Sequence, residues 1–333
     1  MKAIFLCDKP GSVQRVYSDA VVKALGGIAD IADTVYRRSD ILADAERFAD
    51  AEVIFSTWGM PMFTAEEIAS YLPNLKAVFY AAGSVQAFAR PFIERGVRVF
   101  SAWAANAVPV AEYTVAQIVL ANKGFYRLSA LMSAGNVREA RALKGSYKGN
   151  MDENVGIIGA GMIGKLVIKM LRGYRLNVLV FDPFLSDDAA KELGVKKCGL
   201  EELFSSCRVV SNHLANNAQT KGMLGGSLFE KMLPDAAFIN TGRGAQVVES
   251  ELVEVLKSRP DIVALLDVTS PEPPVEGSEL FTLPNCILTP HIAGSLGNEV
   301  HRMSEYILDE FISFVNDGPQ KYEVTLKMLE TMA

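Results

Sequence analysis

Short apolar runs alternate with amphipathic stretches along most of this 333-residue chain. The first runs are KAIFLC at 2–7, AEVIFST at 51–57, LKAVFYAA at 75–82 and VRVFSA at 97–102. A strand that is buried on both faces reads as a nearly continuous apolar run, and strands that alternate with helices form parallel sheets covered by helices on both sides. The pattern therefore predicts an α/β protein.

The alternation occurs as two series, which indicates two domains. The second series has the apolar runs NVGIIG, LNVLVFD, RVVSNHL, AAFINTG, DIVALLDV and CILTPHI. A helical stretch over 106–134, with Asn106 as its N-cap, joins the two series, and a last helical pattern over 298–317 is expected to cross back to the first. We therefore predict two doubly wound parallel-sheet domains of the Rossmann or flavodoxin type, linked by long crossover helices and spanning 1–104 plus 297–333, and 105–296.

Charge and cysteine spacing argue against several classes of protein. The net charge of −6 argues against a nucleic-acid partner, because phosphate binding requires a basic surface. No unbroken run of about 18 apolar residues occurs, so no membrane span is expected, and the start MKAIFLCDKP has too short an apolar stretch for a signal peptide. The cysteines form no C-x-x-C pair, so we expect no metal site and place them as reduced thiols in the cytoplasm.

The stretch VGIIGAGMIG contains the pattern G-x-G-x-x-G. The pattern alone is weak, but here it follows a predicted strand and precedes the helical stretch KLVIKMLR. Gly159 permits a tight turn, Gly161 lets the backbone approach a pyrophosphate at the helix N-terminus, and Gly164 lets the helix pack against the strand. Met162 and Ile163 complete this predicted cofactor-binding loop.

Asp182 ends the next apolar run, LNVLVFD. A dinucleotide-binding fold places an acid there to accept hydrogen bonds from the adenosine ribose hydroxyls. A carboxylate at this point would repel the 2′-phosphate of NADP, and the following Pro-Phe-Leu supplies no basic replacement. NAD is therefore the predicted cofactor.

Three chemically suited side chains follow predicted strands of the second series. Arg243 follows one strand within NTGRG, Glu272 comes shortly after DIVALLDV, and His291 ends CILTPHI. Ligands of open parallel sheets bind outside the carboxyl ends of the strands, so all three are expected beside the cofactor. Histidine exchanges protons near neutral pH, a carboxylate can orient it, and arginine can grip a substrate carboxylate in a bidentate manner. The trio favours oxidation of a hydroxyl to a carbonyl, in which a base takes the O–H proton while hydride leaves for the nicotinamide.

The order of these motifs resembles that of the D-isomer-specific 2-hydroxyacid dehydrogenases. The resemblance covers nearly the whole chain and implies interconversion of a D-2-hydroxy acid and its 2-keto acid. It implies the catalytic residues Arg243, Glu272 and His291. The motifs that carry it are G-x-G-x-x-G with Asp182, then N-T-G-R-G, then D-x-x-x-x-E-P from Asp267 to Pro273, then T-P-H-I-A-G.

The resemblance also implies further roles. Residues 105–296 would bind NAD, residues 1–104 plus 297–333 would bind the substrate, and the protein would be a homodimer through its NAD domain. The loop Ala82–Gly83–Ser84 would receive the substrate carboxylate. The remaining cofactor contacts implied are His213, Thr220, Thr241, Asp267 and Gly294.

Two departures from the family pattern leave alternatives open. Ala215 replaces a proline that is common after the histidine of the adenine loop, and Trp58 stands where smaller or charged residues are common. The first departure leaves open whether Leu214 and Ala215 contact the cofactor. His213 is either a cofactor contact or a core or loop histidine, and Trp58 is either a core residue or part of a substrate pocket.

Two other functions also remain in view. A non-catalytic NAD-sensing regulator of the same fold would need a docking groove and long tails, which the sequence does not suggest. A relative of the formate dehydrogenases would carry glutamine in place of Glu272.

Overall fold

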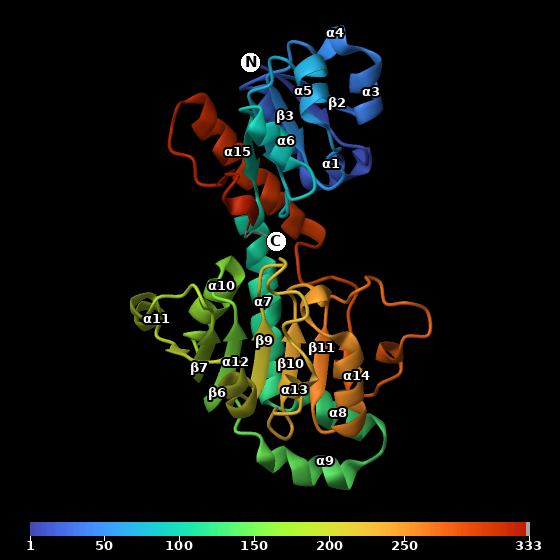
Figure 1. Ribbon diagram of the computed structural model, residues 1–333, viewed down its shortest axis with the longest axis vertical. Helices are drawn as coiled ribbons and strands as arrows, with labels where there is room; N and C mark the ends of the chain where they lie inside the picture. Colours follow the sequence, from blue (N-terminus) through green and yellow to red (C-terminus); the bar gives the residue numbers. More distant parts are fainter. Residues whose placement is uncertain (331–333) are drawn as a thin grey trace. The chain divides into compact units, whose positions relative to one another are not determined.

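The computed structural model of the protein describes residues 1–330 and divides into two compact units (Figure 1). Unit 1 contains residues 1–106 and the chain from Ser295 onward, and unit 2 contains Ala107–Gly294. Each division lies two residues from the boundary expected from the sequence.

Unit 1 is built on a sheet with the strand order β13–β5–β4–β3–β1–β2. Neighbouring strands are parallel, except that β13 pairs with β5 in the antiparallel direction. Its elements are β1 (Lys2–Leu6), α1 (Pro10–Val16), α2 (Asp19–Gly26), β2 (Asp30–Tyr36), α3 (Arg38–Ala43), α4 (Ala45–Phe48), β3 (Val53–Ser56), α5 (Ala65–Tyr71), β4 (Ala77–Tyr80), α6 (Ala89–Glu94), β5 (Arg98–Ser101), the start of α7 (Trp103–Asn122), α15 (His301–Val315) and β13 (Glu323–Val324).

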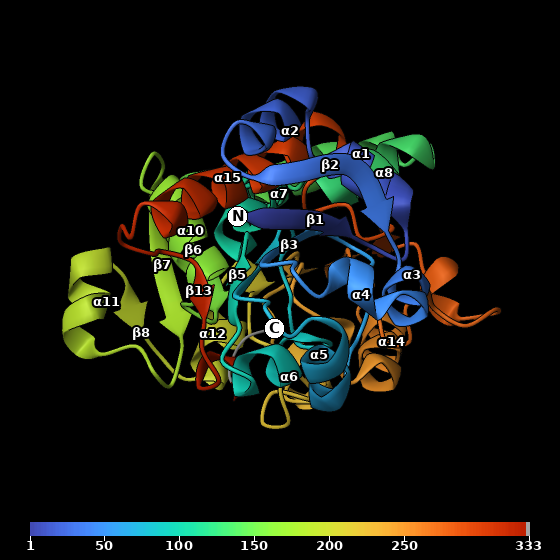
Figure 2. The same cartoon turned by 90° about the horizontal axis from the view of Figure 1, so that it is seen from above.

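Helices cover both faces of the unit 1 sheet. Seen from above, α2 and α15 lie on one side of the strands, and α5 and α6 lie on the other (Figure 2). Every residue of β3 and β4 is buried, which explains the unbroken apolar runs of the sequence. The phenyl rings of Phe79 and Phe100 stack at 4.6 Å between centroids, and Phe311 from α15 packs edge-on against Phe79.

Unit 2 is built on a fully parallel sheet with the strand order β12–β11–β10–β9–β6–β7–β8. The order reverses between β6 and β9, so the loops that follow these two strands meet at the switch point of the sheet. Its elements are the rest of α7, then α8 (Phe125–Ser133), α9 (Val137–Leu143), β6 (Met151–Ile158), α10 (Met162–Leu171), β7 (Arg175–Phe181), α11 (Asp187–Leu193), β8 (Lys196–Lys197), α12 (Leu200–Ser206), β9 (Val209–Asn212), α13 (Gly226–Phe229), β10 (Ala237–Asn240), α14 (Glu249–Ser258), β11 (Val263–Leu266) and β12 (Cys286–Leu288).

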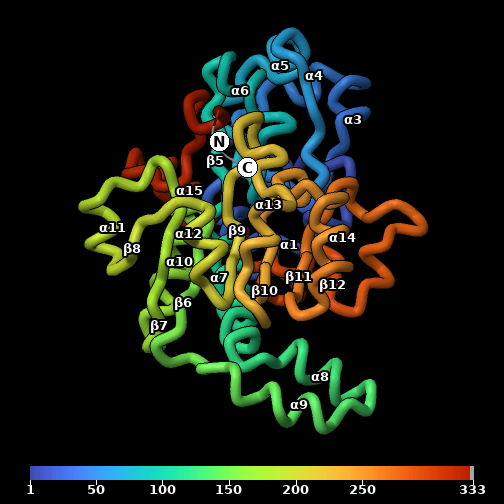
Figure 3. The backbone as a smooth tube through the Cα atoms, turned by 60° about the horizontal axis from the view of Figure 1, so that its bottom comes forward, coloured from blue at the N-terminus to red at the C-terminus, as the bar shows by residue number. Residues whose placement is uncertain are grey.

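The long helix expected over 106–134 is wrong in two respects. It begins at Trp103, so Asn106 lies inside α7 and is not its N-cap; the Asn106 Oδ1 atom accepts a hydrogen bond from the Ser295 N–H instead. The helix ends at Asn122, because Gly124 takes a left-handed conformation (φ 68°) that breaks it from α8. Helices α8 and α9 then form a hairpin that extends away from the sheet of unit 2 (Figure 3).

Helix α7 is long and apolar enough, by length and composition alone, to cross a membrane. No such helix was expected from the sequence, because polar residues interrupt the apolar ones. Its buried side chains Ala111, Val115, Ile118 and Ala121 belong to the core of unit 2, which accounts for its apolar character.

Candidate active site

The glycine loop connects β6 to α10 as expected. Gly159 has a φ of 91°, and a side chain there would press against the His213 carbonyl. A methyl group on Gly164 would overlap with the Gly159 carbonyl oxygen. Gly161 is the N-cap of α10 and has open space where its side chain would point, with no side chain capping the helix. The first backbone N–H groups of α10, including those of Met162 and Ile163, therefore remain available to a pyrophosphate.

Asp182 lies beside this loop. Its Oδ2 atom accepts a hydrogen bond from the Ala160 N–H at 2.6 Å, and its Oδ1 atom accepts those of Phe184 and Leu185 at 2.7 and 3.1 Å. A carboxylate has about four acceptor sites, so these bonds fix the group and leave room for a ribose hydroxyl. The glycine loop and Asp182 thus fit a dinucleotide.

His213 follows β9 and is buried. Its Nε2 atom lies 2.9 Å from Ser211 Oγ, and its Nδ1 atom has no hydrogen-bond partner within residues 1–330. Burial lowers the pKa of His213 to about 3, so the ring is neutral. The Thr220 hydroxyl donates to the Ala215 carbonyl at 2.6 Å and is engaged within its own loop.

The loop that carries Arg243 depends on its two flanking glycines. A side chain on Gly242 would lie 2.8 Å from the Gln246 Oε1 atom, and one on Gly244 would overlap with the backbone of Thr269. The Arg243 Nη1 atom donates to the Gly242 carbonyl at 2.7 Å. The sequence NTGRG therefore encodes a backbone packed too closely for any other residue at these two positions.

Arg243, Glu272 and His291 come together in unit 2. The His291 Nδ1 atom lies 2.6 Å from Glu272 Oε1, which leaves the Nε2 atom free for another partner. Burial lowers the pKa of the Arg243 guanidinium, and the nearby negative charge of Glu272 opposes this shift. Glu272 is therefore in hydrogen-bonding range of His291 and in electrostatic range of Arg243, although the three residues follow different strands.

Asp267 is buried beneath the loop that carries His291. Its Oδ1 atom accepts hydrogen bonds from Thr289 Oγ1 at 2.6 Å and from the Ile292 N–H at 2.8 Å, and its Oδ2 atom accepts from the Ala293 N–H at 2.9 Å. The Asp267 carboxylate thus holds the segment that ends at Gly294.

Thr241 lies just before the Arg243 loop and is buried. Its hydroxyl is 3.2 Å from that of Thr114 in α7. The structure thus places Thr241, a predicted cofactor contact, against helix α7.

The loop Ala82–Gly83–Ser84 follows β4 in unit 1. Its carbonyl groups are occupied: Ser101 Oγ donates to the carbonyls of Ala82 and Gly83 at 2.9 and 2.5 Å. The Ala82 N–H donates to the Tyr80 carbonyl at 2.9 Å, and no carboxylate lies in this loop, so the N–H groups of Gly83 and Ser84 are the ones suited to an anion. On the neighbouring β3 loop, Trp58 is half-buried and the Arg15 guanidinium lies 5.9 Å from its ring centroid.

A buried amide cluster that no sequence pattern indicated supports the site. The Gln246 Nε2 atom donates to the carbonyls of Leu214 and Ala215 at 2.7 and 3.0 Å, and its Oε1 atom accepts from the Arg243 N–H at 3.2 Å and from Asn212 Nδ2 at 2.6 Å. Gln246 therefore ties the His213 loop to the Arg243 loop. Such a side chain resembles any polar residue in the sequence, and only its burial reveals it.

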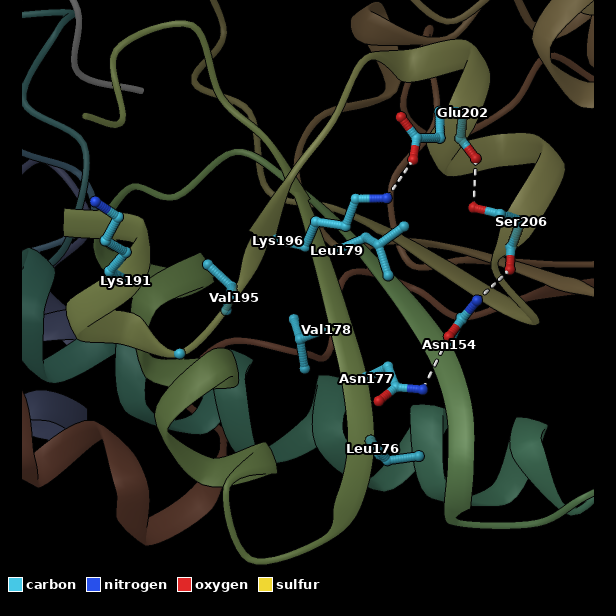
Figure 4. Close-up of a pocket in the computed structure, with 11 residues that line it drawn as sticks. Asn154, Leu176, Asn177, Val178, Leu179, Lys191, Val195, Lys196, Glu202 and Ser206 are labelled. Atoms are coloured by element: carbon cyan, nitrogen blue, oxygen red, sulfur yellow. Dashed lines mark hydrogen bonds and ion pairs between the residues drawn. The ribbon is translucent and has the colours of Figure 1, made fainter. Parts of the chain in front are cut away.

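A separate depression of about 580 Å³ lies beside β7 and β8 (Figure 4). Its polar side chains bond to one another: Asn177 to Asn154, Asn154 to the Ser206 carbonyl, and Lys196 to Glu202. It contains none of the predicted site residues, so we assign it no role in the candidate site.

The fold and the glycine loop define a two-unit α/β protein whose second unit binds a dinucleotide. Residues 115–293 match the family model described as the NAD-binding domain of D-isomer specific 2-hydroxyacid dehydrogenases. The chain belongs to this family, and it uses a nicotinamide dinucleotide cofactor, as predicted.

Individual relatives agree with this membership. D-3-phosphoglycerate dehydrogenase of Archaeoglobus fulgidus is 29% identical over 237 residues, which cover 71% of this chain and 44% of the relative. The chain spans about half the length of the curated relatives that it matches. A phosphoglycerate oxidoreductase structure from Rhizobium etli has a TM-score of 0.81 at 23% identity over 98% of this chain and 99% of its own. D-mandelate dehydrogenase from Rhodotorula graminis has a TM-score of 0.80 at 20% identity over 97% of each chain. These two structures confirm the predicted fold.

Proposed function

We propose that the protein is an NAD-dependent oxidoreductase that interconverts a D-2-hydroxy acid and its 2-keto acid. The observation that carries the proposal is the 2.6 Å contact between His291 Nδ1 and Glu272 Oε1, with Arg243 in electrostatic range of Glu272. An acid–base group, its carboxylate partner and a guanidinium are the groups that this reaction requires. Family membership supports the same reaction.

Each side chain has a distinct role in the proposed reaction. Glu272 accepts the Nδ1 proton of His291 in a hydrogen bond, so Nε2 is the atom that exchanges a proton with the substrate oxygen. In the oxidising direction Nε2 takes the hydroxyl proton, and in the reducing direction it returns one to the carbonyl oxygen. The chemistry that a bound nicotinamide would supply is hydride transfer to or from the substrate C2 atom.

Arg243 holds the substrate carboxylate and polarises the carbonyl oxygen. Its planar guanidinium matches a carboxylate in a bidentate manner, and partial burial strengthens that attraction. Within unit 1, the backbone N–H groups of Gly83 and Ser84 are a second proposed contact for a carboxylate, because the Ala82 N–H donates to the Tyr80 carbonyl. Both contacts select acids and leave the rest of the substrate unspecified.

NAD is the proposed cofactor in preference to NADP. The Asp182 carboxylate is fixed by three backbone N–H groups and cannot turn away easily from a 2′-phosphate. The adjacent Phe184 is exposed and offers no positive charge. A like-charge contact of this kind disfavours NADP.

We further propose that the protein acts in the cytoplasm as a homodimer through its NAD-binding unit. Helix α8 has no buried residue, and Phe125, Met132 and Val137 of the α8–α9 hairpin are 49%, 51% and 38% exposed. A projecting hairpin with exposed apolar side chains suits the surface of a second copy.

The direct test is to mix the protein with NADH and a panel of 2-keto acids and to follow the loss of reduced nicotinamide absorbance. We expect turnover with at least one acid, and loss of turnover in His291→Ala and Arg243→Ala variants that still bind NADH. Wild-type rates in His291→Ala would refute the assigned role. NADH binding without turnover on any acid would favour the regulator alternative.

A further inference from the structure

A chain of hydrogen bonds leads from helix α7 to the catalytic loop. Tyr113 Oη lies 3.2 Å from Thr289 Oγ1, and Thr289 Oγ1 lies 2.6 Å from Asp267 Oδ1. The carboxylate can only accept in this arrangement, so the Thr289 proton points to Asp267. The Tyr113 hydroxyl must therefore be the donor to Thr289. All three residues line a small, partly open pocket of about 20 Å³ in unit 2.

The far end of this chain sets the backbone at His291. The His291 N–H donates to the carbonyls of Asp267 and Thr289, both at 3.0 Å. The Asp267 carboxylate accepts the next two N–H groups, those of Ile292 and Ala293. The loop is thus bonded at three consecutive N–H groups around the histidine.

His291 needs such support because its backbone is in the left-handed region, with a φ of 54°. A non-glycine side chain is sterically strained in this region, and the surrounding structure must offset that strain. Asp267 is 3% exposed, and its buried carboxylate accepts the hydrogen bonds of Thr289, Ile292 and Ala293. Loss of the Thr289 hydrogen bond would leave the Asp267 carboxylate less firmly held, and with it the loop that carries His291.

We infer that Tyr113 is a positioning residue, whose hydroxyl acts through Thr289 and Asp267 to hold His291 in register with Glu272. The inference rests on the proposed function, because it assigns Tyr113 to the catalysis performed by His291. It gives α7, the helix that enters unit 2, a part in ordering the catalytic loop.

The sequence allows a test that does not depend on turnover. The chain has three histidines, His213, His291 and His301, so ¹⁵N spectra of the imidazole groups contain few signals. We expect Tyr113→Phe to shift the His291 imidazole signals and to leave those of His213 and His301 unchanged. Tyr174→Phe, at an exposed tyrosine of unit 2, is the matched control. Unchanged His291 signals in Tyr113→Phe would overturn the inference, even if no substrate were turned over.

Kinetics supply the second readout. With an active 2-keto acid, Tyr113→Phe should lower kcat about three- to tenfold, the effect of one hydrogen bond, with little change in the Kd for NADH. Thr289→Val should have a similar effect and Thr289→Ser, which keeps the hydroxyl, should restore kcat. The double variant Tyr113→Phe/Thr289→Val should be no worse than the poorer single variant, because both interrupt one chain. Fully multiplicative losses would overturn the inference.

Discussion

His291 Nδ1 lies 2.6 Å from Glu272 Oε1, and the two side chains are 48% and 41% exposed. The pair is therefore partly open to solvent. Glu272→Gln keeps a hydrogen-bond acceptor but removes the charge that stabilises the protonated ring. We expect kcat to fall about 10- to 100-fold with NADH binding unchanged. Steady-state kinetics and NADH titration measure both, and Glu276→Gln, at an exposed glutamate of the same loop, should behave as wild type.

The cofactor preference should depend on Asp182. Asp182→Asn keeps one acceptor for the Ala160 N–H but removes the charge. We expect the ratio of kcat/KM for NADPH to that for NADH to rise at least about tenfold, because a like-charge contact is relieved. A wild-type protein that used both cofactors equally would contradict this assignment.

Gly244→Ala should damage the Arg243 loop. The added methyl group would overlap with the Thr269 backbone, which cannot move without displacing the Glu272 loop. We expect the free energy of unfolding to fall by about 1–3 kcal/mol, with a large loss of turnover. The control Gly145→Ala adds a methyl group that meets nothing within 4 Å. Thermal unfolding and activity assays of both variants decide the point, and a Gly244→Ala protein of normal stability and activity would refute it.

His213 should make stability depend on pH. Its pKa is lowered by burial to about 3 in the folded protein, against 6.5 for the ordinary ring. As the pH falls below 6.5, the unfolded chain binds a proton that the folded chain does not, so stability falls with the pH. This group should cost about 2 kcal/mol of unfolding free energy between pH 7.5 and pH 5.0. His213→Gln removes the titrating ring, so its own loss over this range should be smaller by that amount in urea denaturation. An identical loss in both proteins would rule out this origin.

The proposed homodimer should depend on the α8–α9 hairpin. Replacing Phe125 and Met132 together by glutamate places charge on its exposed apolar side chains. We expect light scattering to show a dimer for the wild type and a monomer for this variant, with the same circular dichroism spectrum. Phe281→Glu, a 58% exposed phenylalanine outside the hairpin, should remain a dimer. A monomeric wild-type protein would end the proposal.

The buried strands, and the carboxyl ends of the strands after which the candidate site residues lie, were predicted from the sequence. Runs such as VALL of β11 are apolar because both faces are covered, and the residues after them were found at the carboxyl ends of the sheet. Strand β2 was missed because it forms an edge and its residues are mostly exposed, so DIADTVY lacks an apolar run. Strands β8 and β13 have two residues each, too few for any period.

The residues that hold the site residues in place were harder to predict from the sequence than the site residues themselves. Glu272 and His291 were recognised by residue type and motif, but the partners of Asp267 lie 22–26 residues away and follow another strand. Tyr113 belongs to a helix whose residues give no chemical signal. The local sequence pattern shows which residues are chemically suited to a reaction. Only the folded structure shows which other residues hold those residues in position.

The single amide of Gln246 has a kinetic consequence. It grips the backbone that follows His213, which borders the glycine loop, and it also grips the N–H of Arg243. A bound dinucleotide that ordered the backbone after His213 would at the same time order the Arg243 loop through Gln246. Such coupling would favour an ordered binding of the two ligands, in which the nucleotide binds before the acid.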